Sequence, residues 1–245
     1  MIEPYTVALT SCGRFDLLER TLTTLLPRLD GPVAEIIIAE DSGNSGVRDV
    51  AARFGSDIRV IVNDPPIGQI KSIDRLYSHV ATEWVFHCED DWEFFATGFI
   101  GKSFAILEEC ERLSMVSLRE VPEFGGTEFG PEQVTGSGIR YRVAKDHPRW
   151  ETRFCGMSFN PGLRRMADYR KIGPYAEIRR HVWEVTVSLA YRDMGYRVGL
   201  IADPAVRHIG DGRHIPDPFD KRGFRYRSRR SILKRWMKLL DRLQH

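Results

Sequence analysis

Short apolar runs alternate with helical patterns along the first ninety residues of the chain. Apolar, β-prone runs predict strands at residues 5–10, 35–39, 58–62 and 84–87. Leucines and other apolar residues at helical spacing predict helices at 17–26, 47–54 and 69–80. Such alternation is typical of right-handed βαβ units. We therefore expect an α/β fold in which helices flank a mostly parallel central sheet.

The pattern changes beyond residue 95. It predicts helices at 95–113, 162–171 and 182–194, and strands at 115–118, 196–201 and 205–208. The stretch 120–138 holds five glycines and four acids, which is typical of a loop. We expect one domain over 1–220, with one half at about 1–92 and the other at about 93–220.

Polar residues follow the predicted strands of the first half. They are Thr10-Ser11, Glu40-Asp41, Asn63-Asp64 and Glu89-Asp90-Asp91. Ligands of parallel α/β sheets bind at these carboxyl ends. A pocket with so many acids would repel a nucleoside diphosphate unless a divalent cation lay between them. The chain has neither a Gly-x-Gly-x-x-Gly turn after its first strand nor a phosphate-loop motif, which argues against simple dinucleotide oxidoreductases and phosphate-loop nucleotidases.

Composition and charge add one further feature. The chain has 245 residues, of which 42% are hydrophobic and 29% charged, as in ordinary globular proteins. Its net charge of +2 hides an asymmetry, because residues 221–245 hold ten Lys or Arg and one acid. That tail has a charge of +9 and leaves −7 on residues 1–220. Such polarity favours an anionic surface or ligand as a partner.

The tail itself has two interpretations. Its leucines and Trp236 fall on one helical face, and most basic residues of 234–242 fall on the other. A basic amphipathic helix of this kind is typical of membrane-interface binding, and the alternative is a C-terminal helix packed on the domain. Aromatic residues among the basic ones are too few to favour nucleic acid. Four scattered cysteines and the lack of a secretory signal favour the cytoplasm, with peripheral contact at the inner face of the membrane through 221–245.

The strongest local motif is Glu89-Asp90-Asp91, directly after an apolar strand. Here the chain resembles the GT-A-fold, nucleotide-sugar-dependent glycosyltransferases, and among them the inverting enzymes of family 2. The Glu89-x-Asp91 pair occupies the position of the family's Asp-x-Asp motif. The Glu-Asp-Asp form also resembles the N-acetylglucosaminyltransferases of N-glycan maturation. The resemblance implies that Asp91 binds Mn²⁺ or Mg²⁺ and that Glu89 and Asp90 lie near the ribose and the sugar.

Three other stretches of the first half match the family in order. Residues 7–14 resemble its first strand and nucleotide-contacting turn, residues 35–41 resemble the segment whose acid reads the base, and residues 63–74 resemble the loop that holds the nucleotide. This implies donor contacts from Thr10, Ser11, Arg14, Glu40, Asp41 and Gln69. One departure is that Ile73-Asp74 replaces the family's Arg-Asn, and we expect Lys71 to supply a nucleotide contact in its place.

The second half resembles the family around Glu184, which precedes Tyr196 by twelve residues, the family's spacing from its catalytic carboxylate to this aromatic. The resemblance implies that Glu184 is the base and that His208 contacts the metal or the diphosphate. From the residues alone, Glu184 also fits an N-terminal helix carboxylate that favours the macrodipole. The first acid of the family's usual pair is replaced by Trp183. The resemblance spans about 5–210. It implies that the half at about 1–92 binds the nucleotide and that the half at about 93–220, with the loop 120–138, lies on the acceptor side.

We therefore expect a metal-dependent, inverting glycosyltransferase that moves a sugar from a nucleotide donor, UDP-linked, to a hydroxyl of a glycan, lipid-linked or other acceptor. Two alternatives stay open. A sugar-phosphate nucleotidyltransferase shares a related sheet, although Ser11-Cys12-Gly13-Arg14 is short for its basic glycine-rich loop. A non-catalytic module that binds nucleotide or a membrane surface would bind UDP without turnover.

Overall fold

The computed structural model describes residues 2–120, 127–146, 154–179, 184–210, 212–213 and 215. Up to Ser117 the elements are β1 Tyr5–Ser11, α1 Phe15–Leu25, the 3₁₀ helix η1 Leu26–Arg28, β2 Val33–Glu40, α2 Val47–Ala52, β3 Ile58–Val62, α3 Gln69–Tyr77, β4 Trp84–Glu89, β5 Trp92–Phe94, α4 Phe99–Glu109 and β6 Leu113–Ser117. After it come β7 Gln133–Val134, β8 Arg140–Val143, β9 Gly162–Arg165, α5 Met166–Ile172, the 3₁₀ helix η4 Tyr175–Glu177, α6 Glu184–Asp193, β10 Arg197–Ile201 and β11 Val206–His208.

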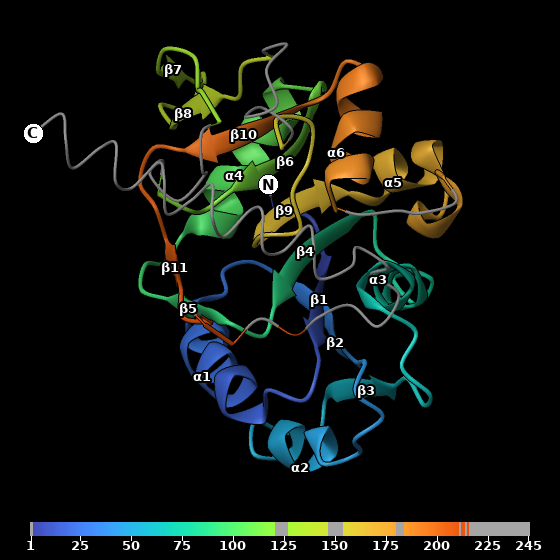
Figure 1. The fold of residues 1–245 in the computed structure, drawn as a ribbon. Coiled ribbons are helices and arrows are strands. Elements are labelled where there is room, and N and C mark those ends of the chain that lie inside the picture. The colour runs from blue at the N-terminus through green and yellow to red at the C-terminus, as the bar shows by residue number, and fades with distance from the viewer. Residues whose placement is uncertain are drawn as a thin grey trace, which may run out of the picture. The chain divides into compact units, whose positions relative to one another are not determined.

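The main sheet has the strand order β3-β2-β1-β4-β9-β6-β10-β8-β7 (Figure 1). The N-terminal strands β3, β2, β1 and β4 pair in parallel, as do β6 and β10. Strand β9 runs antiparallel between β4 and β6 and joins the two halves. The α/β fold expected from the sequence is confirmed, and its sheet is parallel in the first half and mixed in the second.

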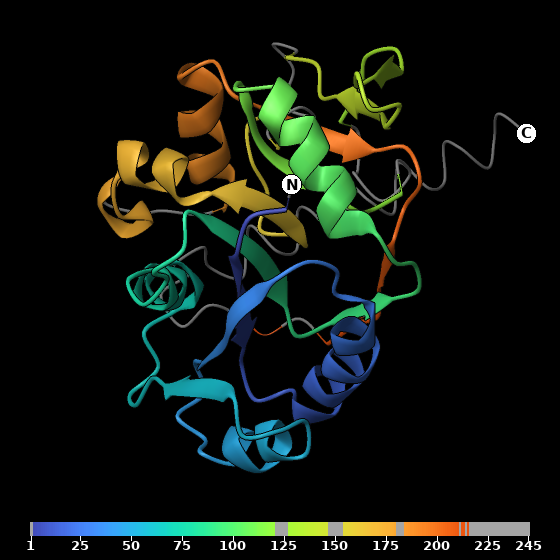
Figure 2. The ribbon, with the colours of Figure 1, turned by 180° about the vertical axis from the view of Figure 1, so that it is seen from behind.

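Helices cover both faces of this sheet, as Figures 1 and 2 show from opposite sides. Helices α1, α2 and α4 pack against one face together with Val7, Leu9 and Phe86. Helices α3, α5 and α6 pack against the other, where Ala8 and Val85 point. Neighbouring residues of a strand alternate between faces, so the unbroken apolar runs of β1 and β4 follow from burial on both sides.

The helix predicted at 162–171 is wrong in its first part. Residues Gly162–Arg165 form β9 and only Met166–Ile172 are helical. A Cβ at Gly162 would lie 2.5 Å from the carbonyl oxygen of Val116, so the close approach of β9 to β6 requires a glycine. Four residues are too few for a period to separate a strand from a helix.

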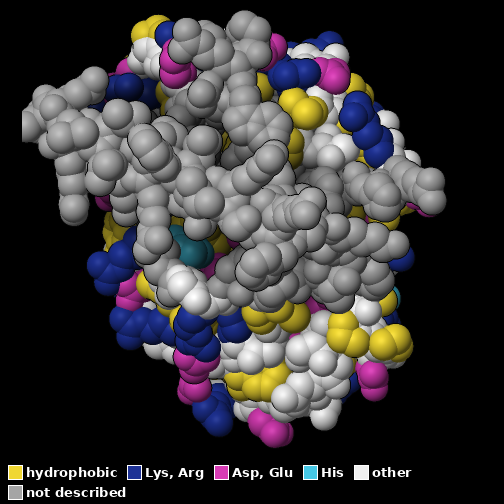
Figure 3. Space-filling view, in the orientation of Figure 1, with side chains coloured by type: hydrophobic (Ala, Val, Ile, Leu, Met, Phe, Trp, Pro, Cys, Tyr) yellow, Lys and Arg dark blue, Asp and Glu magenta, His cyan; other side chains and the backbone are white. Residues whose placement is uncertain are grey.

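A second, two-stranded sheet consists of β5 and β11, which pair antiparallel with His208 opposite Trp92. The sequence predicts β11 and misses the three-residue β5. The buried carboxylate of Glu93 in β5 bonds Arg20 of α1 and Arg207 of β11. Figure 3 shows basic and acidic side chains side by side over α1 and β5. These ion pairs fix the short sheet to α1 and thereby fix the position of His208.

The predicted tail, 221–245, lies outside the described residues, and both of its interpretations stay predictions. Within the residues that the structure describes, none of the helices combines the length and the apolarity that crossing a membrane requires.

Candidate active site

The carboxyl ends of β1, β2 and β4 lie side by side, as parallel pairing requires. Thr10 lies opposite Glu89 in the register of β1 and β4, and Ser11 lies opposite Glu40 in that of β1 and β2. The turn after β1 and the acids after β4 therefore share one edge of the sheet. The structure brings together there most of the residues that the sequence selects.

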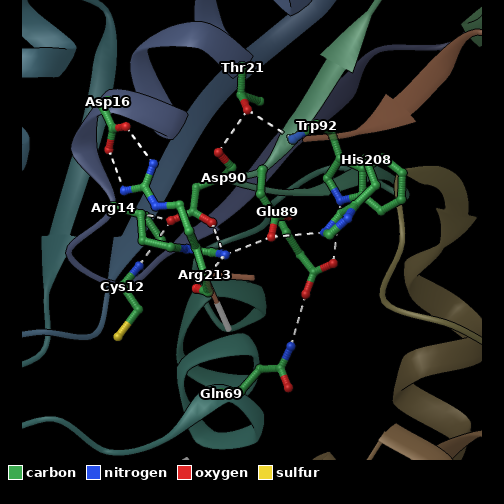
Figure 4. Close-up of polar contacts among 12 residues, drawn as sticks. Cys12, Arg14, Asp16, Thr21, Gln69, Glu89, Asp90, Trp92, His208 and Arg213 are labelled. Atoms are coloured by element: carbon green, nitrogen blue, oxygen red, sulfur yellow. Dashed lines mark hydrogen bonds and ion pairs between the residues drawn. The ribbon is translucent and has the colours of Figure 1, made fainter. Parts of the chain in front are cut away.

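Asp90 is buried at this edge and has several donors around its carboxylate. Arg14 forms an ion pair with it, and the Ser11 hydroxyl and the Cys12 amide donate to its Oδ2 at 3.1 and 3.3 Å (Figure 4). The Thr21 hydroxyl donates to its carbonyl oxygen at 2.9 Å. Burial raises the pKa of Asp90 to about 6 although Arg14 opposes it. These contacts fix the turn between β4 and β5.

Asp91 is buried as well and meets two basic side chains. Arg14 Nη1 lies 2.7 Å and His208 Nε2 3.2 Å from its Oδ2. Its Oδ1 is buried and has no hydrogen-bond partner among the described residues. Burial raises the pKa of Asp91, but the hydrogen bond from His208 and the charge of Arg14 outweigh it and leave the pKa below its ordinary value. Asp91 is therefore held as an anion, and one of its oxygens has no hydrogen-bond partner among the described residues.

The backbone after β11 closes over Asp91. The Ile209 amide donates to the Asp91 carbonyl oxygen at 2.9 Å. A Cβ at Gly210 would lie 2.4 Å from Asp91 Oδ2, so only a glycine fits this position. Further along, Arg213 forms an ion pair with Asp16 at the start of α1. The segment that follows His208 thus runs along the same edge as the turn after β1.

Glu89 points toward the second half of the chain. Its carboxylate accepts from Gln69 Nε2 at 3.0 Å and from Trp92 Nε1 at 3.5 Å (Figure 4). Burial raises the pKa of Glu89 well above its ordinary value, and the charges of Asp91 and Glu184 raise it further. The charge of Glu184 therefore affects Glu89, although the two residues come from different halves of the chain.

Glu40 and Asp41 are engaged with the loops around them. Glu40 Oε1 accepts from the backbone amides of Gly13 and Ser42, each at 2.8 Å. The Asp41 carboxylate accepts from Asn63 Nδ2 and from the amides of residues 67 and 68 at 2.8–2.9 Å. The two acids thereby shape the turn after β1 and the loop before α3. Their predicted contact with the nucleotide stays a prediction.

Glu184 is the first residue of α6 and is partly buried. Its Oε1 accepts from the Ser158 hydroxyl at 2.9 Å and from the Phe159 amide at 2.8 Å. No described residue donates a hydrogen bond to its Oε2. Neutral donors thus hold one oxygen of this carboxylate.

Comparison of the sequence with a family model identifies the family of this chain. Residues 6–170 match the model described as glycosyl transferase family 2. The chain belongs to glycosyltransferase family 2. The match covers the ends of β1, β2 and β4 and stops before Glu184, whose role as the base stays a prediction. No curated protein sequence matches the chain.

Solved structures confirm the GT-A fold of this family 2 chain. A crystal structure of GalNAc-T7 with UDP, GalNAc and Mn²⁺ is 14% identical, with a TM-score of 0.60 over 88% of this chain and 46% of that one. A crystal structure of TarS residues 1–349 from S. aureus is 13% identical, with a TM-score of 0.58 over 83% of this chain and 59% of that one. The chain thus spans about half the length of these proteins.

Lys71 and Asp74 both lie in α3, next to the loop that is expected to hold the nucleotide. Lys71 lies exposed in the first turn of α3, and its nucleotide contact stays a prediction. Asp74, which stands where the family has Asn, turns toward α5 and η4 instead. It accepts from the Tyr169 hydroxyl and from the amides of Tyr175 and Ala176 at 2.8–3.0 Å. The departure from the family motif therefore serves the loop that leads to α6.

Several residues of the site have no signal in the sequence. Thr21, in the middle of α1, accepts from the Trp92 amide and donates to Asp90, so that it holds the acidic turn. Ser158 and Phe159 hold Glu184 but lie in a stretch without a recognisable motif. Only the spatial approach of distant segments selects them. Trp183 and His214 lie outside the described residues.

Proposed function

We propose that the chain is a glycosyltransferase that moves a sugar from a UDP-linked donor to a hydroxyl of a glycan, lipid-linked or other acceptor, with inversion at the anomeric carbon. One observation supports this above the others. The charge of Glu184, at the start of α6 in the second half of the chain, raises the pKa of Glu89, the last residue of β4 in the first half. This supports a single site formed by both halves. A nucleotide-sugar donor between them would have its diphosphate on the side of the acids after β4, and the acceptor would lie on the side of Glu184.

The residues at Asp91 fit a divalent cation. Asp91 Oδ1 is a buried carboxylate oxygen without a partner among the described residues, and His208 Nε2 lies beside the other oxygen. Among the described residues no group of three His, Cys, Asp or Glu could hold a metal ion. Two protein ligands suit Mn²⁺ or Mg²⁺ in nucleotide enzymes, because diphosphate oxygens and water complete the coordination. When bound, such an ion would neutralise charge on the departing diphosphate.

The side chains of this chain would then perform the remaining work. Glu184 Oε2 takes the proton of the acceptor hydroxyl, whose oxygen forms a bond to the anomeric carbon as the bond from that carbon to the UDP oxygen breaks. Oε1 stays held by Ser158 and Phe159, so the carboxylate keeps its direction. Gln69, through Glu89, and Arg14, through Asp90, order the donor side of the pocket.

The first test measures donor hydrolysis and transfer with a panel of UDP-sugars and Mn²⁺. We expect Glu184→Gln to lower kcat by about 10²- to 10⁴-fold and Asp91→Asn to lower turnover by at least about 100-fold. Glu83→Gln is the matched control, because Glu83 forms an exposed ion pair with Arg170 remote from these acids. NMR of the product then gives the anomeric configuration. Full turnover of both variants would refute the assignment.

The same assay separates the alternatives. Release of pyrophosphate from a sugar phosphate and a nucleoside triphosphate would identify a nucleotidyltransferase. Calorimetric binding of UDP with Mn²⁺, without turnover of any donor, would identify a binding module. The glycosyltransferase is supported when UDP and a glycosylated acceptor are both products and when both depend on Glu184.

A further inference from the structure

A buried arginine lies beneath the loop that holds Glu184. Arg164 of β9 is 3% exposed, and no described carboxylate forms an ion pair with it. Arginine is almost never fully buried unless it is paired, since removing a charge from water is costly. A leucine or methionine would fill this position in an ordinary core. The arginine therefore calls for a role that an apolar side chain could not perform.

The contacts of the guanidinium supply that role. Its Nη2 donates to the carbonyl oxygens of Ser158 and Asn160 at 3.0 and 3.2 Å. Its Nη1 donates to the Tyr77 hydroxyl at 3.2 Å. The sulfur atoms of Met157 and Met115 lie 3.9 Å from Nη1 and Nη2, and Nε is buried without a hydrogen-bond partner among the described residues. Arg164 thus binds both ends of the three-residue turn from Ser158 to Asn160.

One peptide group links this cation to Glu184. The carbonyl of Ser158 accepts from Arg164, and the amide of the same peptide group, at Phe159, donates to Glu184 Oε1. Hydrogen bonds in such a chain polarise one another in a low-dielectric interior. The positive charge of Arg164 is therefore transmitted toward the carboxylate without a direct ion pair, and the carboxylate keeps its oxygens for neutral donors and substrate.

The Ser158 hydroxyl adds a second fixed donor. Its oxygen accepts from the Asn160 amide at 3.2 Å and from the Asn160 side chain. Both acceptor positions of a hydroxyl are then filled, and its single proton points to Glu184 Oε1, 2.9 Å away. Because Arg164 holds the carbonyl of Asn160, it also fixes the residue that directs this hydroxyl.

The Tyr77 hydroxyl anchors the arginine from the other side. A guanidinium has only donors, so this hydroxyl accepts from Arg164. The same hydroxyl forms a hydrogen bond with His87 Nδ1 at 3.0 Å. Burial and the charge of Arg164 hold the pKa of His87 well below its ordinary value of 6.5, so the ring beside the arginine is neutral.

We propose that Arg164 is a positioning residue for Glu184, and that it acts through the Ser158–Phe159 peptide and the Ser158 hydroxyl to hold the carboxylate in the direction of the acceptor. This inference rests on the proposed function, in which Glu184 is the base. It assigns a role in turnover to a side chain that touches neither substrate. Donor binding, which depends on β1, β2 and the acids after β4, is expected to be independent of it.

The experiment compares Arg164→Lys, Arg164→Met and Ser158→Ala with the wild type in kcat, in KM for the donor and in calorimetric Kd for UDP with Mn²⁺. A misplaced catalytic group of this kind costs about 10²-fold. We expect kcat to fall about 100-fold in Arg164→Met and about 10-fold in Ser158→Ala, with the Kd for UDP changed less than twofold. Arg164→Lys keeps the charge and one donor, and we expect it to restore part of kcat.

Arg165→Lys is the matched control. Arg165 is the next residue of β9, and its guanidinium donates to carbonyl oxygens at the end of α4 and the start of β6, of which that of Leu113 lies 2.9 Å away. We expect this variant to lower the melting temperature without lowering kcat. A loss of kcat in Arg164→Lys no greater than in Arg165→Lys, or an equal weakening of UDP binding in Arg164→Met, would overturn the proposal.

A readout independent of turnover separates this inference from the proposed function. Amide hydrogen exchange at Phe159 is expected to be at least about tenfold faster in Arg164→Lys than in the wild type, because its hydrogen bond to Glu184 loses support. Unchanged exchange would refute the positioning role even in an active enzyme. Faster exchange together with full activity of Glu184→Gln would instead refute the assignment of the base.

Discussion

The acids after β4 and the carboxylate of Glu184 are each connected by hydrogen bonds to an arginine and a histidine, but the connections differ. At Asp91, Arg14 and His208 touch the carboxylate directly, and their side chains are 16% and 33% exposed. At Glu184, the corresponding pair is Arg164 and His87, both buried, and the arginine acts through a peptide group and a hydroxyl. The Asp91 carboxylate contacts basic side chains directly, whereas the Glu184 carboxylate accepts hydrogen bonds only from neutral donors among the described residues.

This difference suits the two tasks. When a carboxylate binds a metal ion, the ion replaces the basic side chains that were paired with it. Side chains that contact the carboxylate directly and are partly exposed can move away when the ion binds. A base must keep one direction through each turnover, and a buried, uncharged cradle keeps it. The comparison therefore predicts that variants on the Asp91 side respond to added metal, whereas variants on the Glu184 side do not.

The largest expected effect on stability comes from Arg14→Met. Removing one member of a buried ion pair leaves Asp90 and Asp91 uncompensated and costs about 3 kcal/mol of unfolding free energy. We expect saturating Mn²⁺ to restore a large part of this loss, because the ion supplies the missing charge. Chemical denaturation at pH 7 with and without Mn²⁺ measures both quantities. The cost is expected to shrink at pH 5, since the pKa of Asp90 is already raised to about 6.

Arg20→Met is the control for that experiment. Arg20 pairs with the buried Glu93, but its side chain is 58% exposed and Glu93 keeps Arg207 as a second partner. We expect a loss of about 1 kcal/mol or less, without any effect of Mn²⁺. If Mn²⁺ restored the unfolding free energy of Arg14→Met and Arg20→Met equally, the ion would act at a place other than Asp91. The contrast between the Asp91 side and the Glu184 side would then fail.

A medium effect is expected from Gly210→Ala. The new methyl group would lie 2.4 Å from Asp91 Oδ2, so either the backbone after β11 or the carboxylate must shift. Overpacking of this kind costs about 1–3 kcal/mol, and we expect the Mn²⁺ concentration for half-maximal activity to rise about tenfold or more. Titration of the activity with Mn²⁺ measures this.

Gly130→Ala is the matched control for Gly210→Ala. Its methyl group would meet only the carbonyl oxygen of Val143, at an ordinary 3.5 Å. We expect neither stability nor the Mn²⁺ titration to change by more than experimental scatter. If Gly210→Ala were equally silent, the segment after His208 would not be packed on Asp91 in solution.

The sequence predicts the two sides of the site unequally. On the Asp91 side, apolar strands end in acids and parallel pairing brings those ends together, so position along the chain is enough to select Glu89, Asp90 and Asp91. On the Glu184 side, the carboxylate is predicted but its support is not. Ser158 and Arg164 belong to a turn and to a four-residue strand that the sequence presents as the start of a helix. Antiparallel insertion of β9 depends on contacts with β4 and β6, which no local pattern records.

Asp74 illustrates the same limit. In the sequence, Asp74 is part of a departure from the family's nucleotide loop. That departure leads to the prediction that Lys71 supplies the nucleotide contact instead. In the structure its carboxylate faces the other way and accepts from the amides of Tyr175 and Ala176. Helical spacing gives the face of α3 on which Asp74 lies, but it does not say which distant loop that face will meet.

The smallest expected effect concerns His87 and tests the buried side of the comparison. Its pKa is held well below 6.5 in the folded protein, whereas in the unfolded chain it titrates near that value. Below pH 6.5 the unfolded chain therefore binds a proton that the native protein does not, and stability falls with decreasing pH by up to about 1.4 kcal/mol per unit. Other groups add their own slopes, so the difference between variants is the quantity to measure.

We expect His87→Gln to lose this contribution, so that its unfolding free energy falls less steeply than that of the wild type between pH 6.5 and pH 5. Urea denaturation at several pH values gives both slopes. His79→Gln is the control, because it removes a histidine that is not fully buried and contacts the exposed Arg59. Identical slopes for His87→Gln and the wild type would mean that His87 takes up a proton in the native state. The buried side would then contain two adjacent cations, and the neutral cradle inferred for Glu184 would have to be abandoned.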